Sequence, residues 1–261
     1  MTHWQSGFID DTIHYTRTGG SKSPFVLAHG FTDNGLYWTR IAQVLEADYD
    51  VIMPDARGHG QTPNPPEPYT AELHAADLAR VIESLDLGQP IVMGHSMGAV
   101  NTSLLAANYP EHISAAILID PPWHVIPGQR DEAGWLAWRE NLSHQQTLSD
   151  AELLEVCRSN NSTWARIDLE TWVKAKKQVD IRTFDLMNLF SVPWQHVVQH
   201  FQCPTLLVYA DRSLVTPAIA EEAQSLSPHI QLLHVPDAGH SIQRDQFDLF
   251  MAGIQPFLNA R

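Results

Sequence analysis

The pentapeptide Gly94-His95-Ser96-Met97-Gly98 has the residue types and spacing of a turn that presents an activated serine. A serine hydroxyl is a poor nucleophile at neutral pH, so it must be held clear of the sheet and beside a base. A strained turn between a strand and a helix does this, and glycine at both ends allows the close contacts that the turn requires. The apolar run at 90–93 and the helix-like stretch from Ala99 to Tyr109 provide that setting. Ser96 is therefore the candidate nucleophile.

His240 is the candidate general base. It ends the loop Pro236-Asp237-Ala238-Gly239-His240, which follows the strand-like run from Ile230 to Val235. Histidine suits this role because its ordinary pKa, near 6.5, lets it accept and return a proton near neutrality. The chain has 14 histidines, and this one is distinguished by its position after the last strand.

Two backbone N–H groups are candidates for stabilising the oxyanion that forms during acyl transfer. One belongs to Met97, the first amide of the helix that follows Ser96. The other belongs to Phe31, in the turn after the apolar run from Phe25 to Ala28. Both turns follow predicted parallel strands, and ligands bind at the carboxyl ends of such strands.

Four motifs together resemble those of the α/β-hydrolase family, in the family's order and over nearly the whole chain. They are His29-Gly30-Phe31, the loop from Pro54 to Gly60, the pentapeptide around Ser96, and Ala238-Gly239-His240. The resemblance implies an α/β-hydrolase fold, in which helices flank a mostly parallel central sheet and a helical cap is inserted after the sixth strand. The alternation of strand-like and helical patterns supports the same class of fold.

The carboxylate that would orient His240 departs from the family's usual pattern, Gly-x-x-Asp-x-x-Val-Pro. In the stretch from Ala210 to Pro217, Ser213 stands where the acid is expected. Asp211, two residues earlier, is one alternative. Asp120 is preferred, because some relatives carry the acid after the sixth strand and neighbouring strands lie only about 4.8 Å apart. Both aspartates stay candidates for the carboxylate that holds the imidazole tautomer.

The sequence predicts a core of residues 1–122 and 203–261 and a helical cap of residues 123–202. No strand pattern appears in the predicted cap, and six of the chain's 8 tryptophans lie in or beside it. Trp123 lies three residues from Asp120, and we expect it to contact the substrate. The strand-like runs of the core are Ile13 to Thr16, Phe25 to Ala28, Tyr49 to Met53, Ile91 to Met93, Ala115 to Ile119, Thr205 to Tyr209 and Ile230 to Val235.

The charge of the chain disfavours polyanionic partners. With 30 acidic and 16 basic residues, the formal net charge is −14, which argues against nucleic acid and anionic membranes. No apolar run reaches the roughly 18 residues of a membrane span, and Met1 to Gly7 lacks the features of a signal peptide. We therefore expect a cytoplasmic protein whose partner is a small-molecule substrate.

Cofactors are not expected. No grouping of histidine, aspartate and glutamate has convincing metal-ligand spacing, so the sequence predicts no metal and no organic cofactor. Cys157 and Cys203 have no secretory spacing, and we interpret them as free thiols.

These residues favour a serine hydrolase of the esterase or lactonase type, acting on a mostly apolar small molecule. Ser96 would attack the carbonyl and His240 would carry the proton. One alternative is a small-molecule receptor on the same fold with little turnover, which is suggested by the missing acid at Ser213. A carbon–carbon bond hydrolase and a cofactor-free oxygenase or perhydrolase are further alternatives on this fold.

Overall fold

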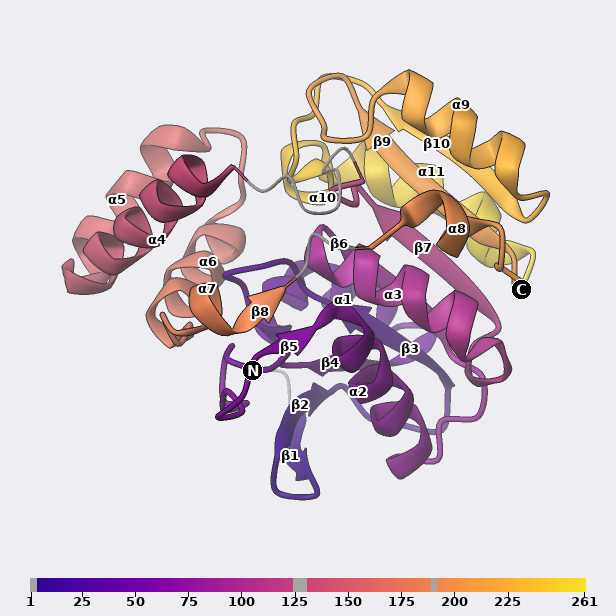
Figure 1. Ribbon diagram of the computed structural model, residues 1–261, viewed down its shortest axis with the longest axis horizontal. Helices are drawn as coiled ribbons and strands as arrows, with labels where there is room; N and C mark the ends of the chain where they lie inside the picture. The colour runs from indigo at the N-terminus through magenta and orange to yellow at the C-terminus, as the bar shows by residue number, and fades with distance from the viewer. Residues whose placement is uncertain (1–3, 124–130, 189–191) are drawn as a thin grey trace.

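Eight strands form the central sheet of the computed structural model, in the order β1-β2-β4-β3-β6-β7-β9-β10 (Figure 1). The structure describes residues 4–123, 131–188 and 192–261. The pairs β1–β2 and β2–β4 are antiparallel, and the other neighbouring pairs are parallel. The predicted fold class is confirmed. The strands are β1 Gln5–Ile9, β2 Ile13–Arg17, β3 Ser23–Ala28, β4 Tyr49–Pro54, β6 Ile91–His95, β7 Ala115–Ile119, β9 Thr205–Ala210 and β10 Ile230–Val235.

The central strands are buried on both faces, which explains their continuous apolar sequences. All residues of β6 and β7 are buried, as expected for parallel strands covered by helices on both sides. Each predicted strand-like run coincides with one of these strands. β1 was not predicted, because it is an edge strand whose first residues are exposed and whose sequence therefore has no apolar run.

Helices cover the two faces of the sheet and divide the core into two apolar clusters. Successive residues of a strand point to opposite faces, so Val26 of β3 belongs to one cluster and Phe25 and Leu27 belong to the other. Helices α2, α3 and α9 pack on the first face, and α1 and α11 pack on the second. Their bounds are α1 Thr39–Leu45, α2 Ala71–Ser84, α3 Met97–Asn108, α9 Pro217–Leu226 and α11 Phe247–Asn259.

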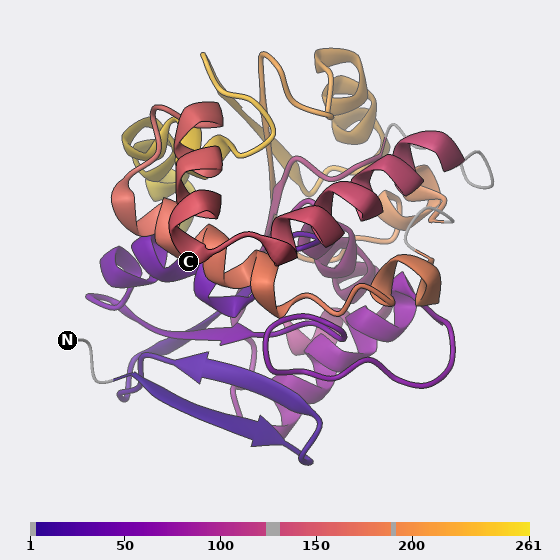
Figure 2. The same cartoon turned by 90° about the vertical axis from the view of Figure 1, so that its left-hand side faces the viewer.

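Between β7 and β9 the chain leaves the central sheet and forms an insertion that is mostly helical. Figure 1 shows α4 and α5 to one side of the sheet, and in Figure 2 they face the viewer in front of the core. The division into a core and a cap at residues 123–202 stays a prediction, and residues 124–130 and 189–191 of that range lie outside the described part. The helices of the insertion are α4 Glu132–Thr147, α5 Asp150–Asn160, α6 Arg166–Gln178, α7 Thr183–Leu186 and α8 Trp194–Val198.

One short strand contradicts the expectation that the insertion lacks strands. β8 (Met187–Asn188) pairs in parallel with β5 (Tyr69–Thr70) of the core. A two-residue pairing has no hydrophobic period, so sequence patterns do not detect it. The remaining short elements are η1 Gly35–Trp38, η2 Pro110–His112 and α10 Ile242–Asp245.

Candidate active site

Ser96 lies in a strained turn between β6 and α3. Its backbone has φ +53° and ψ −116°, a conformation that non-glycine residues adopt only when their surroundings impose it. The Ser96 N–H donates to the carbonyl of Ile119 in β7 at 2.9 Å. A Cβ on Gly94 would collide with the carbonyl of Gly98, so the turn requires glycine there. The sequence around Ser96 therefore builds the turn that its spacing predicts.

Asp120 lies beside His240. Asp120 Oδ2 is 2.6 Å from His240 Nδ1, and the aspartate is fully buried at the end of β7. The carboxylate accepts the backbone N–H groups of Leu214 at 3.0 Å and Val215 at 2.7 Å. Such charge-assisted bonds stabilise a buried negative charge. Asp120 thus has the position and the partners to orient the imidazole.

Asp211, the alternative acid, lies at the surface and contacts other groups. It accepts the Asp237 N–H and the Nε2–H of His234, both at 2.8 Å. These two bonds hold the pKa of Asp211 below its usual value. Of the two candidate carboxylates, the structure brings Asp120 to His240.

Ser213 occupies the family's usual acid position and closes the turn after β9. Its Oγ accepts the Ala210 N–H at 2.9 Å and lies 2.9 Å from the carbonyl of Val215. This turn precedes the N–H groups that hold Asp120. The loop therefore supplies hydrogen-bond donors to the acid at β7.

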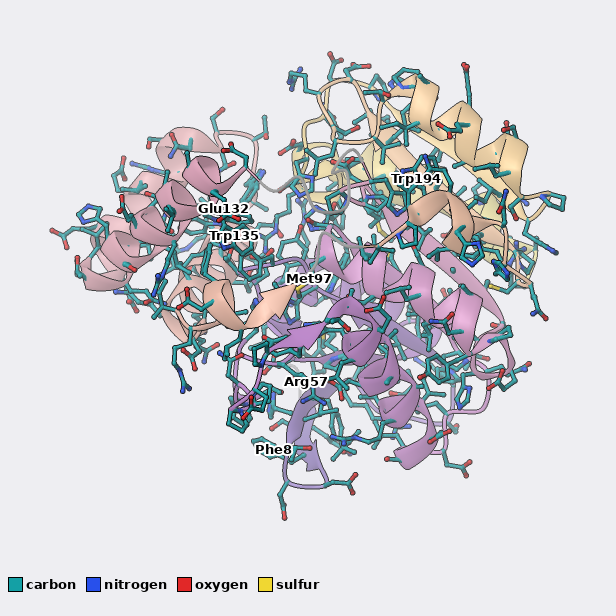
Figure 3. The ribbon with its side chains drawn as sticks, viewed as in Figure 1. Phe8, Arg57, Met97, Glu132, Trp135 and Trp194 are labelled. Atoms are coloured by element: carbon teal, nitrogen blue, oxygen red, sulfur yellow. The ribbon has the colours of Figure 1, made fainter. Side chains whose placement is uncertain are left out.

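The two candidate oxyanion donors follow β3 and β6, which are neighbours in the sheet. In the described part of the chain, the N–H groups of Phe31 and Met97 have no hydrogen-bond acceptor, so both are available to a ligand. The Phe31 ring stacks on Trp135 of α4, with ring centroids 5.3 Å apart. Figure 3 shows Trp135 and Trp194 on opposite sides of Met97.

His95 connects the turn around Ser96 to the loop that carries His240. Its Nε2–H donates to the His240 carbonyl at 2.9 Å, and its Nδ1 lies 3.3 Å from the Tyr37 hydroxyl. Burial and, to a smaller extent, the nearby His240 together lower the pKa of His95 to about 3. His95 is therefore a neutral structural link at neutral pH.

A cavity of about 270 Å³ contains Ser96 and His240 in its wall. Aromatic side chains form much of the remaining wall, and two cations, Lys176 and Arg244, also line it. Sequence reasoning missed both cations. Arg244 could have been selected from the sequence because it lies close to His240 along the chain. Lys176 reaches the cavity only through the packing of α6. The aromatic residues are Phe31, Tyr37, Trp138, Trp164 and Trp172.

Arg244 is buried with part of its hydrogen-bonding capacity unused. Its guanidinium lies 3.8 Å from the Tyr37 ring centroid and 4.7 Å from that of Trp164. Nη2 donates to the Tyr37 carbonyl and to Thr171 Oγ1, each at 3.2 Å. Nε and Nη1 have no hydrogen-bond acceptor among the described residues, and the nearest carboxylate oxygen, on Asp168, is 3.9 Å from Nε.

Trp123, the predicted substrate contact, lies apart from the wall of this cavity. It is buried and stacks on Trp194 of α8, with centroids 5.0 Å apart and planes 8° from parallel. Its indole N–H has no acceptor among the described residues. A role in substrate binding stays a prediction.

The described ranges lack two further kinds of feature. They contain no group of three or more histidine, cysteine, aspartate or glutamate side chains arranged to hold a metal ion. Within the same ranges, no helix has both the length and the hydropathy needed to cross a membrane. Cys157 and Cys203 are buried and free.

Known proteins are similar to this chain in sequence and in fold. A model of the alpha/beta hydrolase fold matches residues 23–246. A 2-(acetamidomethylene)succinate hydrolase of Mesorhizobium japonicum is 35% identical over 259 residues, covering 94% of this chain and 91% of the relative. Lipase 1 of Psychrobacter immobilis is 26% identical, covering 88% of this chain and 75% of the lipase. The structure of an N-formylmaleamic acid deformylase of Pseudomonas putida S16 is 25% identical, with a TM-score of 0.78 and coverage of 97% of this chain and 100% of that one.

The chain belongs to the α/β-hydrolase fold family. Its relatives include lipases, esterases and a deformylase, and the protein is a hydrolase of this fold. These relatives are named for different bonds, so membership of the family does not by itself identify the bond that this chain cleaves.

Proposed function

We propose that the protein cleaves an ester or lactone bond of a small molecule through an acyl-enzyme on Ser96. The observation that carries the proposal is the 2.6 Å contact between Asp120 and His240, in a cavity whose wall also contains Ser96. A neutral imidazole that donates from Nδ1 to a carboxylate presents an unprotonated Nε2. This tautomer is the one that accepts a proton from a serine.

The reaction follows from these groups. His240 Nε2 takes the Ser96 proton as Oγ attacks the substrate carbonyl, and the N–H groups of Phe31 and Met97 stabilise the tetrahedral oxyanion. Asp120 stabilises the imidazolium formed in this step. The imidazolium donates its proton to the leaving alkoxide, and an ester is left on Ser96. Water, deprotonated by His240, then attacks the acyl carbonyl, and the imidazolium returns the proton to Ser96 Oγ as the bond to the acid product breaks.

The lining of the cavity supports a substrate with apolar or aromatic groups. Aromatic side chains provide large apolar contact area at a small cost in side-chain entropy. Phe31 has two roles in this proposal. Its ring belongs to an aromatic cluster with Trp135, Trp138 and Phe184, and its N–H is the proposed oxyanion donor.

Cleavage of an N-acyl bond in a carboxylate-bearing molecule is a second candidate. Arg244 lines the cavity, two of its guanidinium nitrogens are buried without acceptors in the described residues, and a buried cation favours an anionic ligand. Two relatives are named for N-acyl compounds that carry carboxylates, a 2-(acetamidomethylene)succinate and N-formylmaleamic acid. An arginine contact to such a carboxylate would make the anionic substrate preferred over a neutral one.

The receptor alternative rests on the missing acid at Ser213, and the contact between Asp120 and His240 supplies a carboxylate in its place. Measurable turnover of a substrate would therefore favour the hydrolase over the receptor.

A carbon–carbon bond hydrolase would leave simple esters and lactones intact while it acted on a diketone.

The test compares the wild type with Ser96→Ala on p-nitrophenyl butyrate, a medium-chain lactone and an acetamidomethylene succinate. Ser103→Ala is the matched control, because Ser103 Oγ donates to the Ala99 carbonyl inside α3. We expect Ser96→Ala to lower kcat/KM at least about 10³-fold on every substrate that is cleaved, and Ser103→Ala to stay within about twofold. Full turnover by Ser96→Ala would overturn the proposal, and the substrate cleaved fastest identifies the bond class.

A further inference from the structure

We propose that Lys176 of α6 is a positioning residue that holds the oxyanion turn, residues 29–34, in its working geometry. The inference rests on the proposed function, because it assigns Phe31 the role of oxyanion donor. It adds a role for the insertion, whose helix α6 would set the position of a backbone N–H in the core.

In the described part of the chain, the Lys176 ammonium group makes its hydrogen bonds to the residues directly after Phe31. Its Nζ donates to the carbonyl and the hydroxyl of Thr32, both at 2.8 Å, and to Asp33 Oδ1 at 3.1 Å. An ammonium group has three N–H donors, so these acceptors use its full capacity. Lys176 and Asp33 are both buried, and their contact spans 143 positions along the chain.

The turn that Lys176 holds is strained. Thr32 has φ +65°, and a β-branched residue adopts this left-handed region only when its surroundings impose it. The Thr32 N–H donates to His59 Nε2 at 3.2 Å on one side, and Lys176 binds the Thr32 carbonyl on the other. Both peptide groups that flank the strained residue therefore have fixed partners.

The opposite charges of Lys176 and Asp33 stabilise their contact at neutral pH. Burial by itself would raise the pKa of Asp33, but the positive charges of Lys176 and Arg244 outweigh burial and lower it. Burial lowers the pKa of Lys176, and Asp33 opposes that decrease. An ionised pair with these hydrogen bonds compensates the cost of placing each charge in the interior.

A second contact joins the same two segments. Asn34 Nδ2 donates to Gln178 Oε1 at 2.7 Å, one helical half-turn beyond Lys176. The oxyanion turn is thus held to α6 at two positions, Lys176 and Gln178. A shift of α6 would move the Thr32 carbonyl and, through the intervening Phe31–Thr32 peptide group, the Phe31 N–H.

The test is kcat and KM for p-nitrophenyl butyrate in Lys176→Met, with Lys177→Met as the matched control. Lys177 is the next residue, and its Nζ donates to the carbonyls of Gln146 and Leu148 inside the insertion. We expect Lys176→Met to lower kcat about 10- to 100-fold, because misplacing one oxyanion donor removes stabilisation that is specific to the transition state. KM should change less than about threefold, and Lys177→Met should leave both constants within about twofold.

Lys176→Met leaves Asp33 as an unpaired buried charge, so a second variant separates positioning from folding. Lys176→Met combined with Asp33→Asn removes both charges. We expect this double variant to unfold at a temperature close to that of the wild type and still to have a low kcat. Lys176→Arg, which restores a cation with several donors, should recover part of the kcat.

Equal kcat values for Lys176→Met and Lys177→Met would overturn the proposal, as would a folded double variant with wild-type kcat. Ser96→Ala, measured beside them, distinguishes this failure from failure of the proposed function. If Ser96→Ala is inactive and Lys176→Met is fully active, only the positioning role is wrong. If Ser96→Ala is active, the proposed function itself is wrong.

Discussion

The ends of β7 and β9 are neighbouring places for the acid of a hydrolase triad, and this chain uses them in different ways. The β7 end carries Asp120, which is fully buried and contacts His240 at 2.6 Å. The β9 end carries Ser213, whose hydroxyl bonds only to the backbone of its own turn. Asp211 nearby lies at the surface with His234.

The difference lies in the groups that hold each candidate acid as well as in the acid itself. Leu214 and Val215, in the β9 loop, donate their N–H groups to Asp120. The loop that supplies the acid in the usual family pattern here supplies donors to an acid on the adjacent strand. The position of Asp120 therefore depends on contacts from the β9 loop as well as on the end of β7.

The largest effect is expected from Asp120→Asn. The amide cannot stabilise the imidazolium and favours the wrong tautomer, so kcat/KM on p-nitrophenyl butyrate should fall roughly 10³- to 10⁴-fold. One of the N–H groups of Leu214 and Val215 also loses its carboxylate acceptor, which should lower the unfolding temperature. The loss should persist at temperatures where circular dichroism shows the variant to be folded. An activity within tenfold of the wild type would refute the assignment of Asp120.

A smaller effect is expected on the free energy of unfolding in acid, and it concerns the buried histidines. Burial lowers the pKa of His95 to about 3 and that of His74 to about 3, against about 6.5 in an unfolded chain. Below pH 6.5 the unfolded chain binds protons that the folded chain does not, so stability is complete above pH 6.5 and decreases as the pH falls. His95→Gln should reduce this loss.

The measurement is the free energy of unfolding in urea at pH 7 and pH 5. Between these values His95 should account for a loss on the order of 2 kcal/mol, which His95→Gln removes. His234→Gln is the control, because His234 is exposed and paired with Asp211. Equal acid sensitivity in the wild type and in His95→Gln would contradict the neutral, buried state of His95.

The smallest effect is expected from Asp211→Asn. Asp211 contacts His234 and the Asp237 N–H at the surface, so kcat/KM should stay within about twofold of the wild type. The assay is the same p-nitrophenyl butyrate hydrolysis as for Asp120→Asn. A loss of more than tenfold would place the acid after β9 and reverse the comparison.

Much of the fold follows from local patterns in the sequence. Apolar runs predicted the buried strands, and the glycine spacing around Ser96 predicted a turn that the structure contains. Asp120 was the preferred acid because some relatives carry the acid after the sixth strand, and the five apolar residues of β7 placed Asp120 at the end of that strand. These features depend on neighbours in the chain or on adjacent strands.

Other features depend on contacts between distant segments and left no local pattern. Lys176 meets Asp33 across 143 positions, and nothing in the sequence of α6 indicates that partner. The pairing of β8 with β5 joins two-residue segments of the core and the insertion. Arg244 was likewise not selected, since its burial against Tyr37 and Trp164 follows from tertiary packing.

The most direct test of the site is the rate of labelling by a fluorophosphonate, followed by intact mass, for the wild type, Ser96→Ala, Asp120→Asn and Asp211→Asn. This reagent reports an activated serine without assuming a substrate. We expect one rapid adduct on the wild type and on Asp211→Asn, none on Ser96→Ala, and labelling slowed at least about 100-fold in Asp120→Asn. An unlabelled wild type, or undiminished labelling of Asp120→Asn, would contradict a Ser96 nucleophile activated through His240 and Asp120.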